Sequence, residues 1–143
     1  MFDPTREQVR DFFFETWRKR RAGEVLSGME ALALKVVLLH PEYHSVLGAP
    51  ERYREQEYFP ELGQTNPFLH LSLHLALEEQ LSIDQPRGIA ARFAALAARR
   101  GERHAALHDA LECLAEMMWR AQRERAAPDG AAYLDCLEAR ARR

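Results

Sequence analysis

The chain has 143 residues, of which 47% are hydrophobic and 29% are charged. This length fits one domain with a substantial core, and the composition is that of a globular protein rather than a disordered or membrane-embedded one. The formal net charge of −2 excludes a global positive field that would draw the chain to nucleic acid or to an anionic membrane.

Several protein classes are excluded by what the sequence lacks. No apolar run approaches the roughly 18 to 20 residues of a membrane span, and the start lacks a basic-then-apolar signal peptide. We therefore expect a cytoplasmic protein with no nucleic-acid and no membrane partner. The sequence leaves the oligomeric state open, and a homodimer is one of the alternatives. Cys113 and Cys136 follow no metal-ligand or redox spacing, so we expect free thiols in a reducing compartment.

Helix signals dominate the N-terminal half. A first helix is predicted with Asp3 as its N-cap and an end before Gly23. The basic run at its end, Arg18-Lys19-Arg20-Arg21, suits either phosphate binding or a solvated last turn. The second interpretation is favoured because cations complement the helix dipole. A second helix starts at Ser27 and runs to His40, where a proline follows. The next stretch is rich in helix breakers, with a short helix predicted over 51–56.

The C-terminal half gives four more helical predictions. An N-capped helix is expected over 66–84, an alanine-rich one over 88–100 and a long one over 102–125, and Asp129 caps a last short helix. Nothing of useful length alternates with period two. We predict an all-α fold, a single-domain helical bundle of about five to six helices over residues 1–143, with neighbouring helices mostly antiparallel.

All six histidines occur in pairs spaced four residues apart. The pairs are His40 with His44, His70 with His74, and His104 with His108. Two of them continue with a glutamate four residues later, Glu78 and Glu112. Six histidines scattered at random would give only about 0.2 such pairs, so the spacing needs a cause. At helical spacing each His-x3-His-x3-Glu triplet forms a single stripe.

The direction of these stripes predicts a metal site. On the helix predicted over 66–84, the triplet lies among the leucines of the apolar face, where burying ionisable groups without partners costs several kcal/mol. On the helix predicted over 102–125, the triplet lies beside the leucine stripe. Two such helices facing each other offer four imidazoles and two carboxylates, the ligands that iron or zinc selects. We therefore predict that one or two transition-metal ions bind to both triplets.

Three functions fit this pattern. The first is a mono- or di-iron protein for redox chemistry or oxygen binding, and the second is a zinc-dependent hydrolase or transferase. The third is a non-catalytic helical interaction module in which the histidines are structural. Whether the chain is an enzyme is left open. Pro41 interrupts the helix between His40 and His44, so the sequence leaves open whether both join the site or one of them caps a helix.

Four stretches resemble one known family. They are residues 63–86 (GQTNPFLHLSLHLALEEQLSIDQP), residues 8–10 with 16–19, and residues 40–44 (HPEYH). Together they are similar to the proteobacterial family named domain of unknown function 1841 along nearly the whole chain, which implies a bacterial protein and no particular activity. A looser similarity is to hemerythrin-like di-iron bundles. It rests on His74-x3-Glu78, His104-x3-His108 and His104-x4-Asp109, although hemerythrins spread their ligands over four helices.

Overall fold

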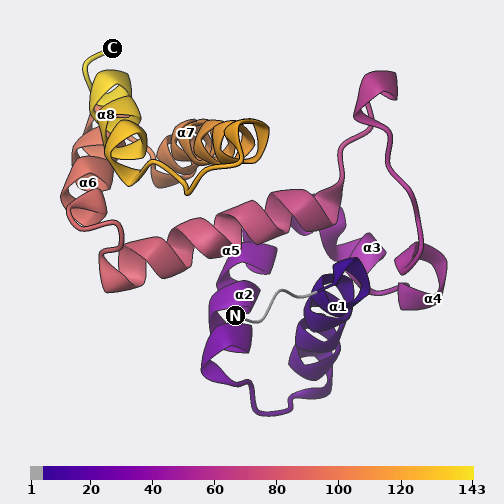
Figure 1. Ribbon diagram of the computed structural model, residues 1–143. Helices are drawn as coiled ribbons and strands as arrows, with labels where there is room; N and C mark the ends of the chain where they lie inside the picture. Colours follow the sequence, from indigo (N-terminus) through magenta and orange to yellow (C-terminus); the bar gives the residue numbers. More distant parts are fainter. Residues whose placement is uncertain (1–4) are drawn as a thin grey trace. The chain divides into compact units, whose positions relative to one another are not determined.

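The computed structural model describes residues 5–143, and within them every regular element is a helix. The all-α prediction is confirmed, but eight α-helices exceed the five to six expected. They are α1 (Arg6–Ala22), α2 (Gly28–Leu38), α3 (His44–Leu47), α4 (Pro50–Tyr53), α5 (Pro67–Ile83), α6 (Ile89–Arg100), α7 (Arg103–Glu124) and α8 (Gly130–Ala141). Two 3₁₀ turns, η1 (Pro41–Tyr43) and η2 (Pro60–Leu62), complete the list (Figure 1).

The difference in number comes from the breaker-rich stretch between α2 and α5. Three of its four short elements begin with a proline in the first turn, and none is longer than four residues. Such single turns carry too few residues for a hydrophobic period, so the sequence predicted only the helix near 51–56. The long helices all lie within a few residues of their predicted ranges.

The chain divides into two compact units, Met1–Leu75 and Ala76–Arg143, which we call unit 1 and unit 2. Helix α5 contributes its first turns to unit 1 and its last turns to unit 2. Each unit has buried residues of its own. A single bundle over residues 1–143 is therefore not confirmed, and the single domain stays a prediction.

Side-chain caps fix where the first helices of unit 1 begin. Thr5 caps α1, and its hydroxyl accepts a hydrogen bond from the backbone N–H of Gln8, whose side chain bonds back to Thr5. The predicted cap, Asp3, lies outside the described residues. Ser27 and Glu30 form the same reciprocal pair at α2, as the sequence predicted. A capping box of this kind satisfies two backbone donors at the start of each helix.

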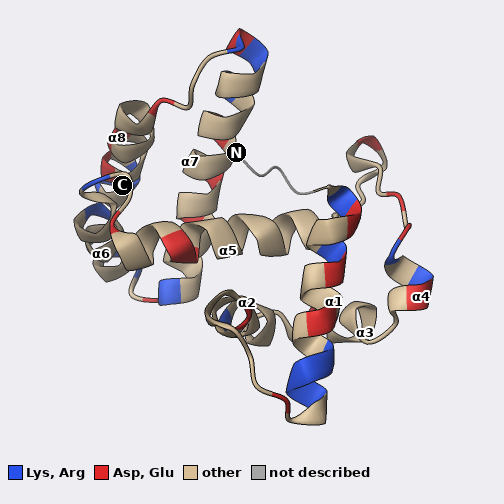
Figure 2. Cartoon of the chain, turned by 60° about the horizontal axis from the view of Figure 1, so that its bottom comes forward, with Lys and Arg blue, Asp and Glu red and all other residues tan. Residues whose placement is uncertain are grey.

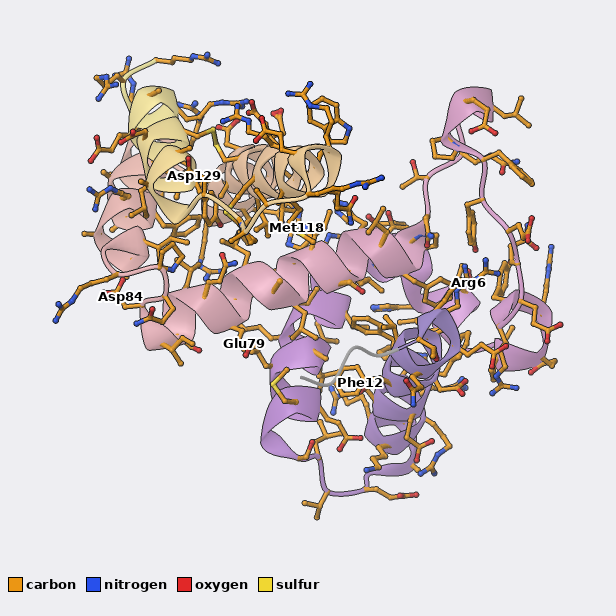
Figure 3. All side chains as sticks on the ribbon, in the orientation of Figure 1. Arg6, Phe12, Glu79, Asp84, Met118 and Asp129 are labelled. Carbon is orange, nitrogen blue, oxygen red and sulfur yellow. A yellow bond between two sulfur atoms is a disulfide. The ribbon has the colours of Figure 1, made fainter. Side chains whose placement is uncertain are left out.

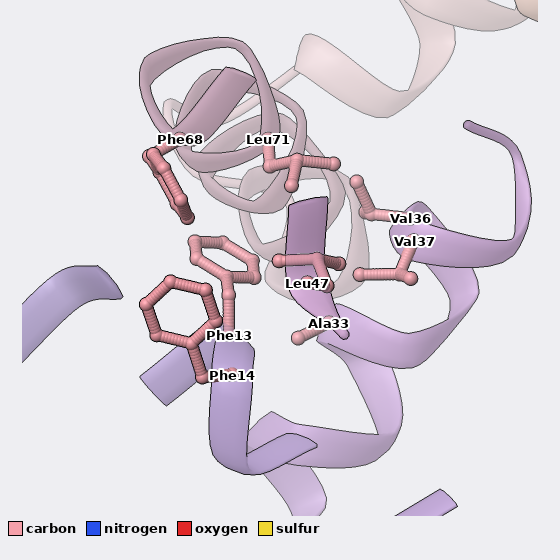
Figure 4. Packing of buried hydrophobic residues seen from close by; sticks show 8 residues of the cluster. All are labelled: Phe13, Phe14, Ala33, Val36, Val37, Leu47, Phe68 and Leu71. Carbon is pink, nitrogen blue, oxygen red and sulfur yellow. The ribbon is translucent and has the colours of Figure 1, made fainter. Parts of the chain in front are cut away.

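The core of unit 1 brings α1, α2, α3 and α5 together (Figure 4). Phe13 and Phe14 project from α1, and the Phe14 ring meets Phe68 edge-on with 5.4 Å between ring centroids. Val36 and Leu71 are fully buried beside them. Burial of each such side chain stabilises the fold by about 1.5–3 kcal/mol, so these contacts hold the first turns of α5 against α1 and α2.

Arg10 connects the core of unit 1 to residues 53–56, at the end of α4 and just after it. Its Nη1 donates hydrogen bonds to the backbone carbonyls of Tyr53 (3.1 Å), Arg54 (3.1 Å) and Gln56 (2.7 Å). The guanidinium lies 4.7 Å from the centre of the Phe68 ring, and the side chain is only 1% exposed. Burial lowers the pKa of Arg10. One buried side chain thus binds three carbonyls of this segment, of which the Tyr53 carbonyl also accepts from the N–H of Gln56.

Unit 2 packs α6, α7 and α8 against one another. Its core contains Phe93 and Leu96 from α6, Leu107 and Leu114 from α7, and Leu137 from α8. The hydroxyl of the buried Tyr133 donates to the side-chain oxygen of Gln80 at 2.8 Å, which ties α8 to the last turns of α5. Asp129 caps α8 at the start of that helix, as the sequence predicted (Figure 3).

Asp84 shapes the junction between α5 and α6 (Figure 3). Its backbone has φ 52°, in the left-handed region. Its carboxylate accepts hydrogen bonds from the N–H groups of Gly88 (3.1 Å) and Ala90 (3.0 Å), at the start of α6. These bonds, with Ala90 contributing most, lower the pKa of Asp84 because they stabilise the charged form.

Cys113 on α7 and Cys136 on α8 form a disulfide, with an S–S distance of 2.02 Å and Cα atoms 5.9 Å apart. The prediction of two free thiols is therefore wrong. The packing of α7 against α8 brings the two cysteines together, and their spacing in the sequence does not predict this packing. Disulfides persist mainly in oxidising compartments, so this bond does not favour the cytoplasmic location, which stays a prediction.

Within residues 5–143, no helix combines the length and the apolar character needed to span a membrane. This agrees with the absence of a long apolar run in the sequence.

Candidate metal centre

Two of the predicted ligands lie on the first turns of α5. Asn66 caps this helix, because its side-chain oxygen accepts hydrogen bonds from the N–H groups of Phe68 (3.0 Å) and Leu69 (3.2 Å). His70 and His74 follow one turn apart, so their rings lie on the same face of the helix. His74 is fully buried and His70 is half-buried. The expectation that α5 turns these imidazoles toward the core is confirmed.

A third imidazole comes from the end of α2. His40 follows the last turn of that helix, just before Pro41 starts η1, and is 1% exposed. Its Nδ1 lies 2.8 Å from the carbonyl oxygen of Val36. Because a carbonyl only accepts, Nδ1 carries the proton, and in the neutral ring the lone pair is on Nε2. Metal-binding histidines are commonly oriented by this kind of hydrogen bond.

The three rings converge. Their centroids are 4.5 Å apart for His40 and His74, 5.0 Å for His40 and His70, and 4.7 Å for His70 and His74. Each ring offers one nitrogen such that these nitrogens lie within 4.8 Å of one another. Tyr43 stacks on His40 at 5.7 Å with nearly parallel rings, and its own pKa is raised by burial. We call His40, His70 and His74 the histidine cluster of unit 1.

One nitrogen-to-nitrogen distance in the cluster is close to the separation of two ligands on a tetrahedral ion. The Nε2 atoms of His70 and His74 are 3.2 Å apart. Two nitrogens bound to one tetrahedral ion at about 2.0–2.1 Å each are separated by about 3.3–3.4 Å. Without an ion, one Nε2 donates to the other. With an ion, both Nε2 lone pairs would point at it, and the proton that lay between them would move to the Nδ1 of its own ring, which stays neutral.

His44 has a different environment. Its Nε2 donates to the carbonyl of Val37 at 2.9 Å, and its ring stacks on Trp17 with 4.3 Å between centroids. The ring is therefore held by the backbone and by an aromatic face, and it is not part of the histidine cluster of unit 1. Of the pair His40 and His44, the structure places only His40 beside the histidines of α5.

Glu78 lies one turn beyond His74 on α5, in unit 2. It is 3% exposed, and both of its oxygens bind the guanidinium of Arg103, at 2.7 Å and 3.0 Å. This bidentate ion pair neutralises the buried carboxylate and raises the pKa of Arg103. Arg103 therefore supplies the positive charge beside the buried Glu78 that was expected from a metal ion.

The second triplet lies on α7 in unit 2. His104 is half-buried, His108 is exposed, and their ring centroids are 4.4 Å apart. Glu112 is exposed and pairs with Arg140 at 3.0 Å. Asp109, from the hemerythrin-like comparison, pairs with Arg100 and with Arg140. Because this triplet belongs to unit 2, its meeting with the histidines of unit 1 stays a prediction.

The family comparison agrees with the resemblance seen in the sequence. The profile of the family described as Domain of unknown function (DUF1841) matches residues 5–139. The chain belongs to this family. No curated protein and no solved structure matches the DUF1841 chain. The family description assigns no activity, so a function has to be inferred from the residues of the site.

Three partners in the DUF1841 chain had no signal in the sequence. Arg103 and Arg140 bind the two predicted carboxylates across 25 and 28 residues of sequence, and no local pattern connects positions that far apart. The carbonyl of Val36 fixes the ring of His40, and backbone groups leave no trace in composition. Tyr43 carried a signal, because it lies within the HPEYH stretch between His40 and His44.

Proposed function

We propose that the DUF1841 chain binds a single divalent transition-metal ion, zinc in preference to iron, through His40, His70 and His74. The observation that carries the proposal is the convergence of three ring nitrogens within 4.8 Å, two from α5 and one from His40 in the segment that follows α2. The separation of 3.2 Å between two of them supports it, because that is close to the spacing on a tetrahedral ion.

The chemistry of the ligands favours zinc. The cluster offers imidazole nitrogens, which suit zinc, whereas mononuclear non-haem iron sites ordinarily combine two histidines with a carboxylate. A di-iron centre needs carboxylates as well. In this chain Glu78 and Glu112 are paired with Arg103 and Arg140. A mononuclear zinc centre is therefore better supported than the di-iron alternative.

Three protein ligands are also the usual number in catalytic zinc sites. A tetrahedral zinc ion with three imidazoles keeps one position for water, whose pKa the ion lowers to about 7. His40 and His74 are buried, while His70 is half-buried and lies nearest to solvent. This arrangement supports the hydrolase or transferase alternative over iron redox chemistry. The sequence-based alternative is that a side chain of the second triplet fills the fourth position.

The test is metal content and affinity in protein purified without a histidine tag. We expect one zinc per chain after supplementation. His40→Gln, His70→Gln and His74→Gln should each weaken zinc binding, measured by competition with a chelating dye, by more than about 100-fold. The expected size follows because loss of an outer hydrogen-bonding partner alone costs 10–100-fold. His44→Gln is the matched control, since it keeps an N–H for the Val37 carbonyl and should leave the affinity unchanged.

Two further results decide between the alternatives. If the histidines are structural, the three glutamine variants will lose stability like other core substitutions, and the wild-type chain will hold no stoichiometric zinc. The double variant His104→Gln/His108→Gln tests the second triplet. An affinity loss as large as that of His70→Gln would assign the fourth position to α7, and an unchanged affinity would leave it to water.

A further inference from the structure

Unit 1 contains a groove of about 830 Å³ along α1. One wall is a single face of α1 between Asp11 and Ala22, and the other wall is formed by residues 47–54, from the end of α3 through α4. The volume falls within the range of about 300–1,000 Å³ that is typical of small-molecule sites. The groove shares no residue with the histidine cluster, so it is a separate candidate site.

The floor and walls of the groove include a fixed apolar surface. Phe14 and Leu47 line it and are 5% and 2% exposed, which anchors them in the core of unit 1. Trp17 and Pro50 line it as well. The Trp17 ring stacks on His44 at 4.3 Å, so the indole is held in place before any ligand binds. A rigid aromatic wall reduces the ordering that binding would otherwise require.

Most of the charges around the groove are already compensated. Arg54 binds Asp11 at 2.8 Å. Arg18 binds Glu15 at 2.6 Å and Glu24 at 2.8 Å. These ion pairs form part of the rim and leave neither arginine as an isolated cation.

Arg21 differs from its neighbours in the basic run at the end of α1, which is visible in blue in Figure 2. It lines the groove, and among residues 5–143 no carboxylate forms an ion pair with it. Its Nη1 lies only 3.3 Å from the position that a Cβ on Gly48 would occupy, so the missing side chain of Gly48 gives the guanidinium room at the groove. The groove therefore combines an apolar surface with one uncompensated cation.

We propose that this groove binds a small organic carboxylate with an aromatic or aliphatic body. The carboxylate accepts hydrogen bonds from the guanidinium of Arg21, whose planar fork matches its two oxygens. The body packs against Trp17, Phe14 and Leu47. A single negative charge is expected, because the groove offers a single uncompensated positive one.

The probe for this proposal is 4-phenylbutyrate, compared with its uncharged amide. Trp119→Phe leaves Trp17 as the only tryptophan, so its fluorescence reports on the groove. We expect a saturable change in Trp17 fluorescence with the carboxylate. The amide should bind at least about tenfold more weakly, because a hydrogen bond between charged groups is stronger than one to a neutral group by about that factor in affinity. All titrations contain a chelator, so that failure of the zinc proposal would not affect the result.

Two variants test the role of Arg21. Arg21→Gln should weaken carboxylate binding at least about tenfold and remove the preference over the amide. Arg20→Gln is the matched control, because Arg20 is the preceding basic residue and does not line the groove. Gly48→Ala places a methyl group against Nη1 of Arg21 and should also weaken binding. Non-saturable titrations, equal affinity for acid and amide, or equal effects of Arg21→Gln and Arg20→Gln in folded protein would overturn the proposal.

Discussion

The histidine pairs on α5 and on α7 have the same spacing in sequence and similar distances between ring centroids, 4.7 Å and 4.4 Å. Their surroundings differ. In unit 1 the pair includes the fully buried His74 and is joined by His40 from the segment between α2 and η1. In unit 2 His108 is exposed and Glu112 pairs with Arg140. Helical spacing alone makes a pair, whereas burial and a third ring from a separate element make a candidate centre.

The largest expected effect is stabilisation of unit 1 by zinc. An ion that binds only the folded state stabilises it by about 4 kcal/mol when its concentration is 1,000 times the Kd. Hydrogen exchange should then slow at the end of α2, which leads into His40, and in the first turns of α5, which carry His70 and His74. Equal slowing in α7 around His104 would instead show that both triplets hold the ion. His74→Gln is the control, since it should remove the zinc effect.

The second effect concerns unit 2, which has a covalent bond where unit 1 has the histidine cluster. The Cys113–Cys136 disulfide closes a loop with a sequence separation of 23. Its reduction should lower the free energy of unfolding of unit 2 by about 3 kcal/mol, because the unfolded chain gains conformational freedom. Denaturant unfolding with and without reductant measures this. Cys113→Ser/Cys136→Ser should be insensitive to reductant, and an unchanged midpoint in the wild type would contradict the prediction.

The buried carboxylate of α5 gives a third, smaller effect. Arg103→Ala leaves the charge of Glu78 buried and should destabilise unit 2 by about 2 kcal/mol. This is less than the 3–5 kcal/mol of a fully buried pair, because the Arg103 side chain is 45% exposed. Glu78→Leu/Arg103→Leu, which removes both charges, should recover most of that loss. Zinc affinity should stay unchanged in each variant, and a loss of zinc would return Glu78 to the ligand set.

The sequence predicts those features of the fold and of the candidate site that depend on residues close together in the chain. Caps at Ser27, Asn66 and Asp129, and the inward face of α5, follow from residue type and helical period. The partners of Glu78 and Glu112 could not be predicted, since any of the 20 lysines and arginines could neutralise a carboxylate. Only packing selects Arg103 and Arg140. The same reason explains the disulfide, which depends on how α7 and α8 pack.

The smallest expected effect lies at the junction between α5 and α6, within unit 2. The Asp84 carboxylate accepts hydrogen bonds from the N–H groups of Ala90 and Gly88, and these bonds lower its pKa below the usual 3.8. The unfolded chain therefore takes up this proton at a higher pH than the folded one. The stabilisation is complete well above pH 3.8 and is lost as the pH falls through the lowered pKa.

Asp84→Asn should accordingly lower the urea midpoint of unit 2 at pH 7. The difference from wild type should shrink as the pH falls below 3.8 and through the lowered pKa of Asp84, because the aspartate of the folded chain then becomes neutral as well. Asp135→Asn, which alters an exposed carboxylate on α8, is the matched control and should show no such trend. Equal pH dependence of the two variants would mean that the charge of Asp84 does not stabilise the start of α6. Because Asp84 lies in unit 2, neither variant should change zinc binding by the histidine cluster of unit 1.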